Sequence, residues 1–512
     1  MSSVPANSLA QVASILDPNT TVSINDKIST LRTFASTLND SLTMERSVEI
    51  LNKIPLGLFY NGFSVENDQL TIILCELINK ILHPFSYAMI VSSENKPFLI
   101  QGLTHFTPEI RYLSLNQVFK CLSSDASLTN MLESDIFPLV VASIAFQDTK
   151  TANKACDLLY KMASTKIGQN AFFNGTCITM LKQLLKINGT VSFRVYDLII
   201  KVAILSDETF ERCESSGLLT DFIQELESDD LLIKINAMEL LNEIAVTSSG
   251  ITFLEKANLL SNISAVLDNE DDSDIAVQLV KCAVLKFIGH LGANETIDFG
   301  ALSERYQLLE RIEKCLDSSN IEILIVSLST VGLVGSHVNG LKLISQKNSL
   351  LTKFFENQTS VGQVKAVFLQ SLSKLLLVRN QNDKEIETLT LSYYNRLEGQ
   401  PSALLSLIKE AKQPEDHIRI AAFAVMQAIA CHIWGSEMMA QSNEFMNYIL
   451  NRTTEYTEQG QSWKYAIIQT LASAPNAVQL FSHHSYYTQL QVYIRQGAHY
   501  RIIEPVAAVE NS

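Results

Sequence analysis

One pattern of three apolar residues recurs at a fixed interval of 41 residues between residues 137 and 267. Within each trio the residues are spaced i, i+3 and i+7, so they lie on one side of a helix with about 3.6 residues per turn. The four trios are Phe137, Val140, Ile144; Ile178, Leu181, Leu185; Leu219, Phe222, Leu226; and Leu260, Ile263, Leu267. Each trio predicts the buried face of one helix, and the constant interval predicts a repeated unit.

A second set of apolar residues follows the same interval and also predicts core positions. It consists of Leu158, Leu159, Met162; Ile199, Ile200, Ala203; and Leu240, Leu241, Ile244. Between the two sets the register aligns four residues of types favoured in turns and helix N-caps, namely Asp148, Gly189, Asp230 and Asp271. A unit of about 40 residues with two or three helices is typical of armadillo and HEAT repeats. The sequence therefore predicts an all-α, armadillo/HEAT-like helical-repeat solenoid of roughly a dozen units.

The length of the chain agrees with a repeat architecture. Its 512 residues exceed the about 250 to 300 residues over which a single compact core usually grows. Only 11 prolines and 19 glycines are present, which favours long helices over hairpins and flexible linkers. Breaks in the pattern predict four segments: irregular N-terminal capping repeats at 1–90, regular repeats at 91–378, C-terminal repeats at 379–500 and a tail at 501–512.

Charge and composition indicate the compartment and exclude some partners. The net charge of −15 and the pI near 5.1 disfavour nucleic acid and anionic membranes, which an acidic surface repels. The most apolar run, Ile321 to Gly335, is too short to span a bilayer. Eight scattered cysteines without a C-x-x-C pair and an N-terminus without a signal-peptide pattern indicate a reducing compartment. We expect a soluble cytoplasmic protein, with the nucleus as an additional location.

The sequence contains no local signature for catalysis, a cofactor or a metal. The phosphate-binding, nucleophile-elbow and zinc-helix motifs are absent, so none of these sites is predicted. A glycine-rich stretch from Gly332 to Gly340 is interpreted as a helix end and tight turn, and Gly168, Gly250 and Gly435 are given the same role. His483 and His484 lack a carboxylate or cysteine at ligand spacing, which favours a surface turn over a metal site.

The acidic run from Asp268 to Asp274 lengthens one inter-helix turn by about three residues relative to the preceding unit. Negative charge is favourable at a helix N-terminus, so the run predicts a solvated turn that leads into a helix. The alternative is a cation site, but the spacing lacks the glycine and final glutamate of an EF-hand loop.

Polar stripes on the second helix of successive units are the candidate partner-binding residues. They are Lys154, Asp157, Lys161; Arg194, Asp197, Lys201; and Asn236, Glu239, Glu243. Solenoids bind partners along the surface formed by one helix of each unit. The other interpretation is that these residues form an ordinary solvated helix face, and the middle stripe lies one residue out of register.

Several stretches, in matching order, resemble the 26S proteasome non-ATPase regulatory subunit 5 family. They are Phe193–Ala203 with Ser216–Leu219, Thr330–Ser336 with Asn339–Gly340, Lys464–Tyr465 with Thr470–Ala472, and Glu504–Val506 with Ala508–Glu510. The resemblance runs from about residue 90 onward, whereas the first 90 residues share only the helical pattern.

The resemblance implies a function as an assembly chaperone for the base of the proteasome regulatory particle. Members of the family hold an AAA-type ATPase subunit by its C-terminal domain before the ring is complete, and they are absent from the finished particle. The large non-ATPase scaffold subunit is a second implied partner, and no catalytic residue belongs to the family. Two alternatives remain open: an armadillo-type cargo or trafficking adaptor, disfavoured because only Trp434 and Trp463 could form its tryptophan ladder, and an enzyme or generic scaffold built on distant repeats.

Overall fold

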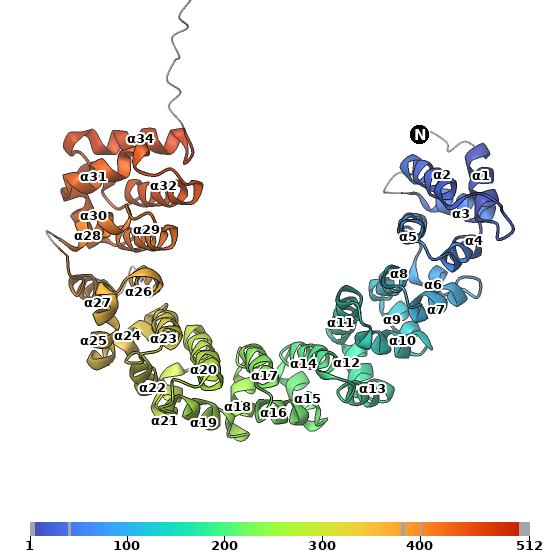
Figure 1. Ribbon diagram of the computed structural model, residues 1–512, viewed down its shortest axis with the longest axis horizontal. Helices are drawn as coiled ribbons and strands as arrows, with labels where there is room; N and C mark the ends of the chain where they lie inside the picture. Colours follow the sequence, from blue (N-terminus) through green and yellow to red (C-terminus); the bar gives the residue numbers. More distant parts are fainter. Residues whose placement is uncertain (1–5, 39–41, 380–383, 400–401, 501–512) are drawn as a thin grey trace, which may run out of the picture. The chain divides into compact units, whose positions relative to one another are not determined.

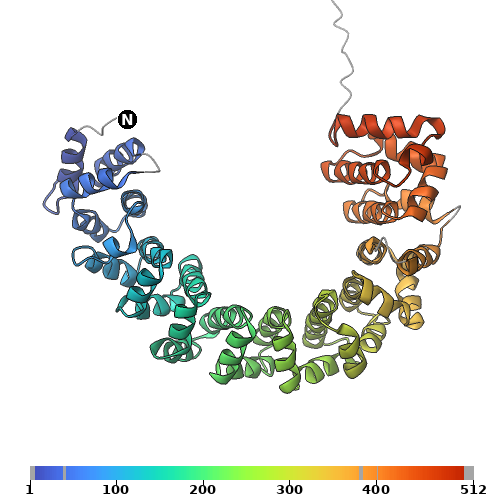
Figure 2. The same cartoon turned by 180° about the vertical axis from the view of Figure 1, so that it is seen from behind.

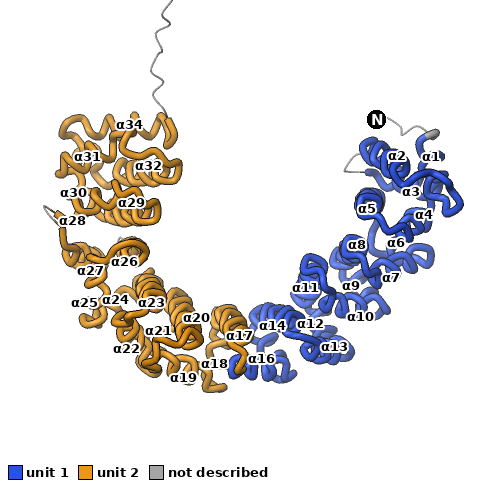
Figure 3. Tube along the Cα trace, in the orientation of Figure 1, with its two compact units in different colours: residues 1–227 blue, residues 228–512 orange. Residues whose placement is uncertain are grey.

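The computed structural model describes residues 6–38, 42–379, 384–399 and 402–500, and the predicted tail at 501–512 lies outside these ranges. Every regular element in these ranges is a helix (Figure 1), and helices of successive repeats pack on one another, so the predicted all-α repeat fold is confirmed. The chain divides into two compact units, residues 1–227 (unit 1) and 228–512 (unit 2), which Figure 3 shows in two colours.

Unit 1 contains sixteen α-helices and three short 3-10 helices within the described residues. They are α1 (Ala6–Leu16), α2 (Ile24–Thr37), α3 (Met44–Lys53), α4 (Leu56–Asn61), η1 (Gly62–Ser64), α5 (Asp68–Leu82), α6 (Tyr87–Ile90), α7 (Lys96–Thr104), α8 (Pro108–Val118), η2 (Phe119–Ser123), α9 (Asp125–Leu132), α10 (Ile136–Ala142), η3 (Ser143–Ala145), α11 (Thr149–Ala163), α12 (Lys166–Phe173), α13 (Thr176–Leu184), α14 (Gly189–Ala203), α15 (Asp207–Ser215) and α16 (Leu218–Leu226).

Unit 2 contains eighteen α-helices and four 3-10 helices within the described residues. They are α17 (Leu231–Ile244), α18 (Ser248–Lys256), α19 (Leu259–Ala265), η4 (Val266–Asp268), α20 (Ile275–Ala293), α21 (Phe299–Tyr306), α22 (Leu308–Cys315), α23 (Ile321–Val334), α24 (Val338–Ser345), α25 (Asn348–Glu356), η5 (Asn357–Thr359), α26 (Gly362–Leu377), α27 (Lys384–Asn395), α28 (Ala403–Glu410), α29 (Asp416–Ala430), α30 (Ile433–Gln441), α31 (Asn443–Leu450), η6 (Arg452–Thr454), α32 (Glu458–Ala472), α33 (Ala477–Leu480), η7 (His483–Ser485) and α34 (Tyr486–Gln496).

Each repeat has two short helices followed by one long helix, for example α12, α13 and α14 in unit 1 and α18, α19 and α20 in unit 2. The long helices pack on one another in sequence order. In unit 1 they are α5, α8, α11 and α14, and in unit 2 they are α17, α20, α23, α26, α29 and α32, as Figures 1 and 2 show from opposite sides. The predicted divisions at residues 90 and 378 stay predictions, although α26 packs on α29 across the second.

The repeated apolar residues form the core at most of the expected positions. Ten of the twelve trio residues are buried, and Ile178 and Leu185 are half-buried. In the second set, Leu241 and Ile244 are fully buried, but Leu240 is half-buried. The predicted core position of Leu240 is therefore wrong, because the buried side of α17 is centred on Ala237, Leu241 and Ile244.

N-cap residues determine where the long helices begin, as the aligned turn positions indicated. The carboxylate of Asp148 accepts a hydrogen bond from the Thr151 N–H at 2.7 Å, and Asp230 caps α17 in the same way. Gly189 is the first residue of α14, and the cap there is the preceding asparagine. In the acidic turn the cap is Asp274 instead of Asp271, which matches the predicted insertion of three residues.

Glycines allow the sharp bend between a long helix and the next short helix. A Cβ atom on Gly168 would lie 2.0 Å from the Met162 carbonyl oxygen, and one on Gly250 would lie 1.9 Å from that of Ile244. Both glycines, like Gly435, lie in the first turn of a short helix and not at the C-terminal end of the preceding long helix. In the stretch Gly332–Gly340 the predicted helix end and turn are confirmed, because Gly335 is the C-cap of α23 and α24 begins at Val338. Gly332 itself lies inside α23, where a Cβ would be 2.7 Å from the Ser371 Cα, so it serves helix packing.

Helix α20 is long and apolar enough to cross a membrane by length and composition alone, and three bent helix pairs pass the same test together. This 19-residue helix was not predicted from the sequence, where Ile321–Gly335 is the most apolar run. In unit 2, α20 packs between α17 and α23, and its buried side chains include Val284, Phe287 and Ile288. These buried residues of α20 serve the packing of the repeat stack, whereas Ile275 and Leu279 near the start of the helix are exposed.

Candidate partner-binding surfaces

The first polar stripe lies on α11 and folds onto aromatic rings of the neighbouring repeat in unit 1. The Lys154 ammonium lies 3.8 Å from the centre of the Phe119 ring, and that of Lys161 lies 4.9 Å from the same ring. Lys161 also pairs with Asp157 at 3.6 Å. An ammonium group over an aromatic face is attracted by the negative charge of that face. The stripe is therefore a half-exposed layer of lysines that covers two aromatic residues, Phe119 and Tyr112.

The second stripe, on α14, contains one structural residue and one exposed ion pair. Arg194 donates hydrogen bonds from Nη1 to the carbonyl oxygens of Ile144, at 3.1 Å, and Phe146, at 2.7 Å. It thereby satisfies carbonyls at the end of a helix in the preceding repeat, where a cation is favourable. Asp197 and Lys201 pair at 2.8 Å, one helical turn apart. Arg194 thus has a structural role, and the exposed pair of Asp197 and Lys201 lies one and two helical turns further along α14.

The third stripe belongs to unit 2. Glu239 is exposed, whereas Asn236 and Glu243 are half-buried on α17. The other two stripes lie on α11 and α14, and these two helices pack on one another within unit 1. The contribution of all nine residues to partner binding stays a prediction.

A groove that the sequence pattern did not predict lies beside the α11 stripe. It has a volume of about 310 Å³ and is lined by α5, α8 and the start of α11, including Ile72, Tyr112 and Lys150. Ile72 is 55% exposed, although α5 buries most of its other apolar residues. The Lys150 ammonium lies 4.7 Å from the centre of the Tyr112 ring. The groove therefore offers apolar, aromatic and cationic contacts close together, which are typical of protein interfaces.

A larger hollow in unit 2, of about 1250 Å³, lies among α29, α30, α32 and α34. His432 borders it and is held from both ring nitrogens, with Nδ1 2.8 Å from Glu387 Oε1 and Nε2 2.6 Å from the Leu376 carbonyl oxygen. Trp434 stacks on the His432 ring at 5.3 Å. The two groups that contact the His432 ring belong to α26 and α27, so the histidine fixes the turn between α29 and α30 against these helices.

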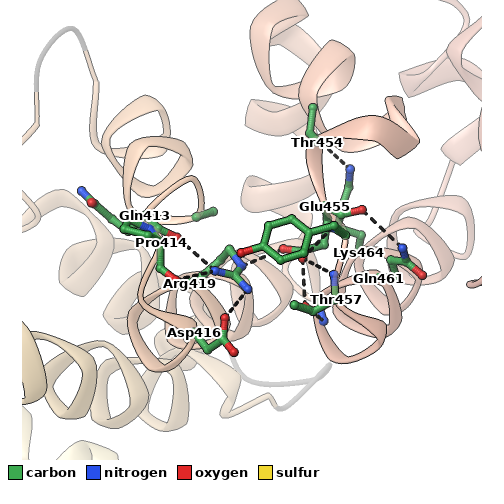
Figure 4. Close-up of polar contacts among 12 residues, drawn as sticks. Gln413, Pro414, Asp416, Arg419, Thr454, Glu455, Thr457, Gln461 and Lys464 are labelled. Atoms are coloured by element: carbon green, nitrogen blue, oxygen red, sulfur yellow. Dashed lines mark hydrogen bonds and ion pairs between the residues drawn. The ribbon is translucent and has the colours of Figure 1, made fainter.

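A buried charged network joins α29 to the start of α32 (Figure 4). The Glu455 carboxylate accepts a hydrogen bond from Arg419 Nε at 2.9 Å, and its other oxygen accepts from the backbone N–H of Thr457 at 2.8 Å. Lys464 donates to the Asn451 carbonyl and to the Thr454 hydroxyl, both at 2.6 Å. Burial lowers the pKa of Lys464 to about 7, against the opposing effect of Glu455. Every charged group here meets a fixed protein partner, so the network is structural.

The remaining reactive side chains do not form a chemical centre in the described part of the chain. All eight cysteines are free, and burial raises the pKa of each thiol, to about 12 for Cys75 and Cys177. Thiols with raised pKa values are poor nucleophiles at neutral pH. Among the described residues no group of three or more histidine, cysteine, aspartate or glutamate side chains could hold a metal. His483 and His484 pack against each other in a surface turn, as predicted.

The acidic turn is partly neutralised by basic residues of α20 and α22. Asp268 pairs with Arg311 at 2.8 Å, and Asp272 pairs with the buried Lys281 at 2.6 Å. Hydrogen bonds and charge from these basic residues hold the pKa values of both carboxyls below their usual range, although burial opposes the shift. The turn is thus fixed by protein cations and leads into α20 through its Asp274 cap.

Comparison with known proteins identifies the family to which this repeat protein belongs. The family model described as proteasome non-ATPase 26S subunit matches residues 11–512. The chain belongs to this family. The match begins well before residue 90, so the N-terminal repeats, which resembled the family only in helical pattern, are part of the same family domain.

Two relatives named 26S proteasome non-ATPase regulatory subunit 5 are similar over nearly their whole length. The protein from Bos taurus is 26% identical over 467 residues, which are 90% of this chain and 90% of the relative. The protein from Homo sapiens is 25% identical over 470 residues, covering 90% and 92% of the two chains. Among solved structures, a chain in a complex of Kap95p with RanGDP has a TM-score of 0.58 at 11% identity, covering 94% of this chain and 65% of that chain. The structural likeness shows the fold alone.

Proposed function

We propose that this protein is an assembly chaperone for the base of the 26S proteasome regulatory particle. It binds an AAA-type ATPase subunit of the ring, by its C-terminal domain, before the particle is complete, and it is absent from the mature particle. The observation that supports this proposal is the family match over residues 11–512 together with relatives named as proteasome regulatory subunits. The large non-ATPase scaffold subunit is the second proposed partner, and the cytoplasm is the proposed site of action, with the nucleus in addition.

The long-helix surfaces supply what such a holdase needs. Stacked repeats present an extended face that can contact a folded domain over many side chains. In unit 1 that face carries the lysines of α11 and the groove at Ile72 and Tyr112, which are accessible and chemically mixed. We propose a binding role without catalysis, in keeping with a family of regulatory subunits. The alternative of a cargo adaptor has little support, since Trp434 and Trp463 lie on separate helices and Trp434 packs against His432.

Binding is proposed to exclude the proteolytic core. A repeat protein of this length covers part of the ATPase that the ring later uses for docking, so chaperone and core compete. Co-sedimentation decides this point. The protein is expected with free ATPase subunits and with incomplete base, and its recovery in stoichiometric amount with completed, core-bound proteasome contradicts the proposal.

The contact residues are tested by charge reversal of the stripes. Changing Asp157, Glu239 and Glu243 to lysine is expected to weaken binding of the purified ATPase C-terminal domain, because opposite charges across an interface are matched. A control variant with the same change in net charge reverses Glu133, Glu211 and Glu304, which are exposed on or beside short helices. Isothermal titration calorimetry measures the affinity of both variants for the ATPase C-terminal domain. Equal affinity of the two variants shows that the stripes are not the contact and leaves the chaperone function to the co-sedimentation test.

A further inference from the structure

Four consecutive long helices of unit 2 each expose an apolar side chain at the N-terminal end, and together we call these side chains the N-terminal row. The exposed fractions are 67% for Leu232 of α17, 70% for Ile275 of α20, 61% for Ile321 of α23 and 84% for Val361, the N-cap of α26. Apolar side chains at these positions contribute nothing to the core. Single exposed apolar residues are ordinary, whereas their recurrence at one position of successive repeats makes a continuous feature.

Contacts between neighbouring turns show that the members of the row lie at the same edge of unit 2. Helix α17 packs on α20, α20 on α23, and α23 on α26. The turn before α20 contacts the turn before α23, where the Ser318 hydroxyl donates a hydrogen bond to Asp272 Oδ2 at 2.5 Å. Ion pairs of Asp268 with Arg311 on α22 and of Asp317 with Lys353 on α25 hold the ends of successive short helices together. The helix starts are therefore held side by side, and the row follows one edge of the stack.

Basic residues neutralise part of the negative charge at this edge, where Asp268, Asp272 and Asp317 form ion pairs, and the rest has no ion pair in the described part of the chain. Six carboxylates flank the row and have no ion pair among the described residues, namely Asp229, Asp230, Glu270, Asp271, Asp274 and Glu322. The stretches 228–235, 268–279, 316–323 and 356–364 contain one basic residue, Lys234. Asp230 and Asp274 are fixed as helix caps, so part of this charge is held in place beside the apolar side chains.

We propose that the N-terminal row docks a protein segment in which lysine or arginine alternates with apolar residues. Apolar side chains of the segment cover Leu232, Ile275, Ile321 and Val361, while its cations face the flanking carboxylates. Complementary charge steers and orients such a partner, and burial of the apolar row supplies the binding energy. A second copy of this chain and an anionic lipid surface are both negatively charged, so electrostatic repulsion disfavours the binding of either one to this edge. The inference concerns unit 2 alone and does not depend on the identity of the partner held as a chaperone.

Three fluorescent 16-residue peptides test the proposal on the full chain by anisotropy. One alternates lysine and leucine, one replaces its leucines with glutamine, and one replaces its lysines with glutamate. The lysine/leucine peptide is expected to bind at least tenfold more tightly than either of the others. Equal binding of the lysine/glutamine peptide overturns the proposal, because charge alone then explains the interaction.

Two triple serine variants show whether the lysine/leucine peptide binds at the N-terminal row. The row variant carries Leu232→Ser, Ile275→Ser and Ile321→Ser, and the control variant carries Ile187→Ser, Val246→Ser and Val478→Ser, three apolar residues that are 54%, 54% and 61% exposed elsewhere. The row variant is expected to weaken the lysine/leucine peptide at least tenfold and the control variant by less than twofold. Equal losses in the two variants overturn the proposal.

Photo-crosslinking gives a readout that does not need a variant. A benzophenone residue in place of a central leucine of the peptide is expected to crosslink within residues 228–235, 268–279, 316–323 or 356–364. Crosslinks confined to other parts of the chain contradict the assignment. Sedimentation velocity of the wild-type protein completes the test, since a concentration-dependent dimer that the row variant abolishes assigns the row to a second copy of the chain.

Discussion

The helices around α14 and those around α32 build the same kind of repeat with different interiors. Helix α14 buries Val195, Ile199 and other residues that are almost all apolar. Helix α32 buries Lys464, and the adjacent turn buries Glu455 against Arg419. In the first region apolar side chains fill the interior and polar contacts such as that of Arg194 lie at its edge, whereas in the second a charged network inside the repeat also satisfies the carbonyl groups of an irregular turn. The same repeat geometry can therefore be stabilised mainly by periodic apolar contacts, as around α14, or by specific polar contacts as well, as around α32.

Removing one member of the buried network gives the largest expected effect. Glu455→Gln leaves the Arg419 guanidinium without its buried counter-charge, and breaking such a pair costs about 3 to 5 kcal/mol. Urea unfolding followed by tryptophan fluorescence measures the loss, since both tryptophans, Trp434 and Trp463, lie in this part of unit 2. The exposed Glu458→Gln, three residues away, is the control and should change stability by less than about 0.5 kcal/mol. Equal losses in the two variants mean that the network contributes no stability.

The apolar interior of the repeats is tested at two neighbouring leucines. Leu241→Ala removes a fully buried side chain of α17 and is expected to destabilise the protein by about 2 to 5 kcal/mol. Leu240→Ala removes a half-buried side chain, so its cost should be about 1 kcal/mol. Thermal melting followed by circular dichroism compares the two. A larger loss for Leu240→Ala shows that the buried face of α17 is assigned wrongly.

This pair of leucines also shows what the sequence could and could not predict. The 41-residue interval predicted the helical repeats, most core positions and the longer turn before α20, because these depend on periodicity along one chain. It did not separate Leu240 from Leu241, since burial at the edge of a helix face depends on the angle of the neighbouring helix. It also missed the first short helix of each unit, although Phe172, Cys213 and Leu254 keep the same interval and are buried.

The candidate surfaces were less accessible to sequence reasoning. Arg194 was predicted to face a partner, yet it binds carbonyl oxygens of the preceding repeat, a contact 48 residues away along the chain. Lys464 and Glu455 have no sequence signal that distinguishes them from exposed charges. The exposed Ile72 and the N-terminal row could have been found only by comparing apolar residues against a known buried face.

The charged interior makes the stability of this region depend on pH. Because the folded-state pKa of Lys464 is lowered to about 7, the unfolded chain binds more protons than the folded chain above that pH. The free energy of unfolding should therefore rise between pH 7 and pH 9, by about 2 kcal/mol from this group. Lys464→Met should lose that part of the rise when unfolding is followed by tryptophan fluorescence at several pH values. An unchanged slope contradicts the assignment, and Lys120, with its pKa lowered to about 8, contributes in the same direction in unit 1.

The smallest expected effect is on the surface of unit 1, where lysines lie on aromatic rings. Lys154→Gln removes the ammonium from the Phe119 ring and should cost about 0.5 to 1 kcal/mol. The exposed Lys166→Gln is the matched control, with an expected change below about 0.5 kcal/mol. Because the stability cost is small, any larger loss in binding of the ATPase C-terminal domain, measured by calorimetry on folded protein, reports a direct contact. A tenfold weaker affinity for Lys154→Gln with an unchanged Lys166→Gln assigns the α11 stripe to the partner interface. Equal affinities for the two variants mean that Lys154 serves to cover the aromatic residues, as Arg194 serves to bind carbonyl oxygens, and that the contact with the partner lies elsewhere on the long helices.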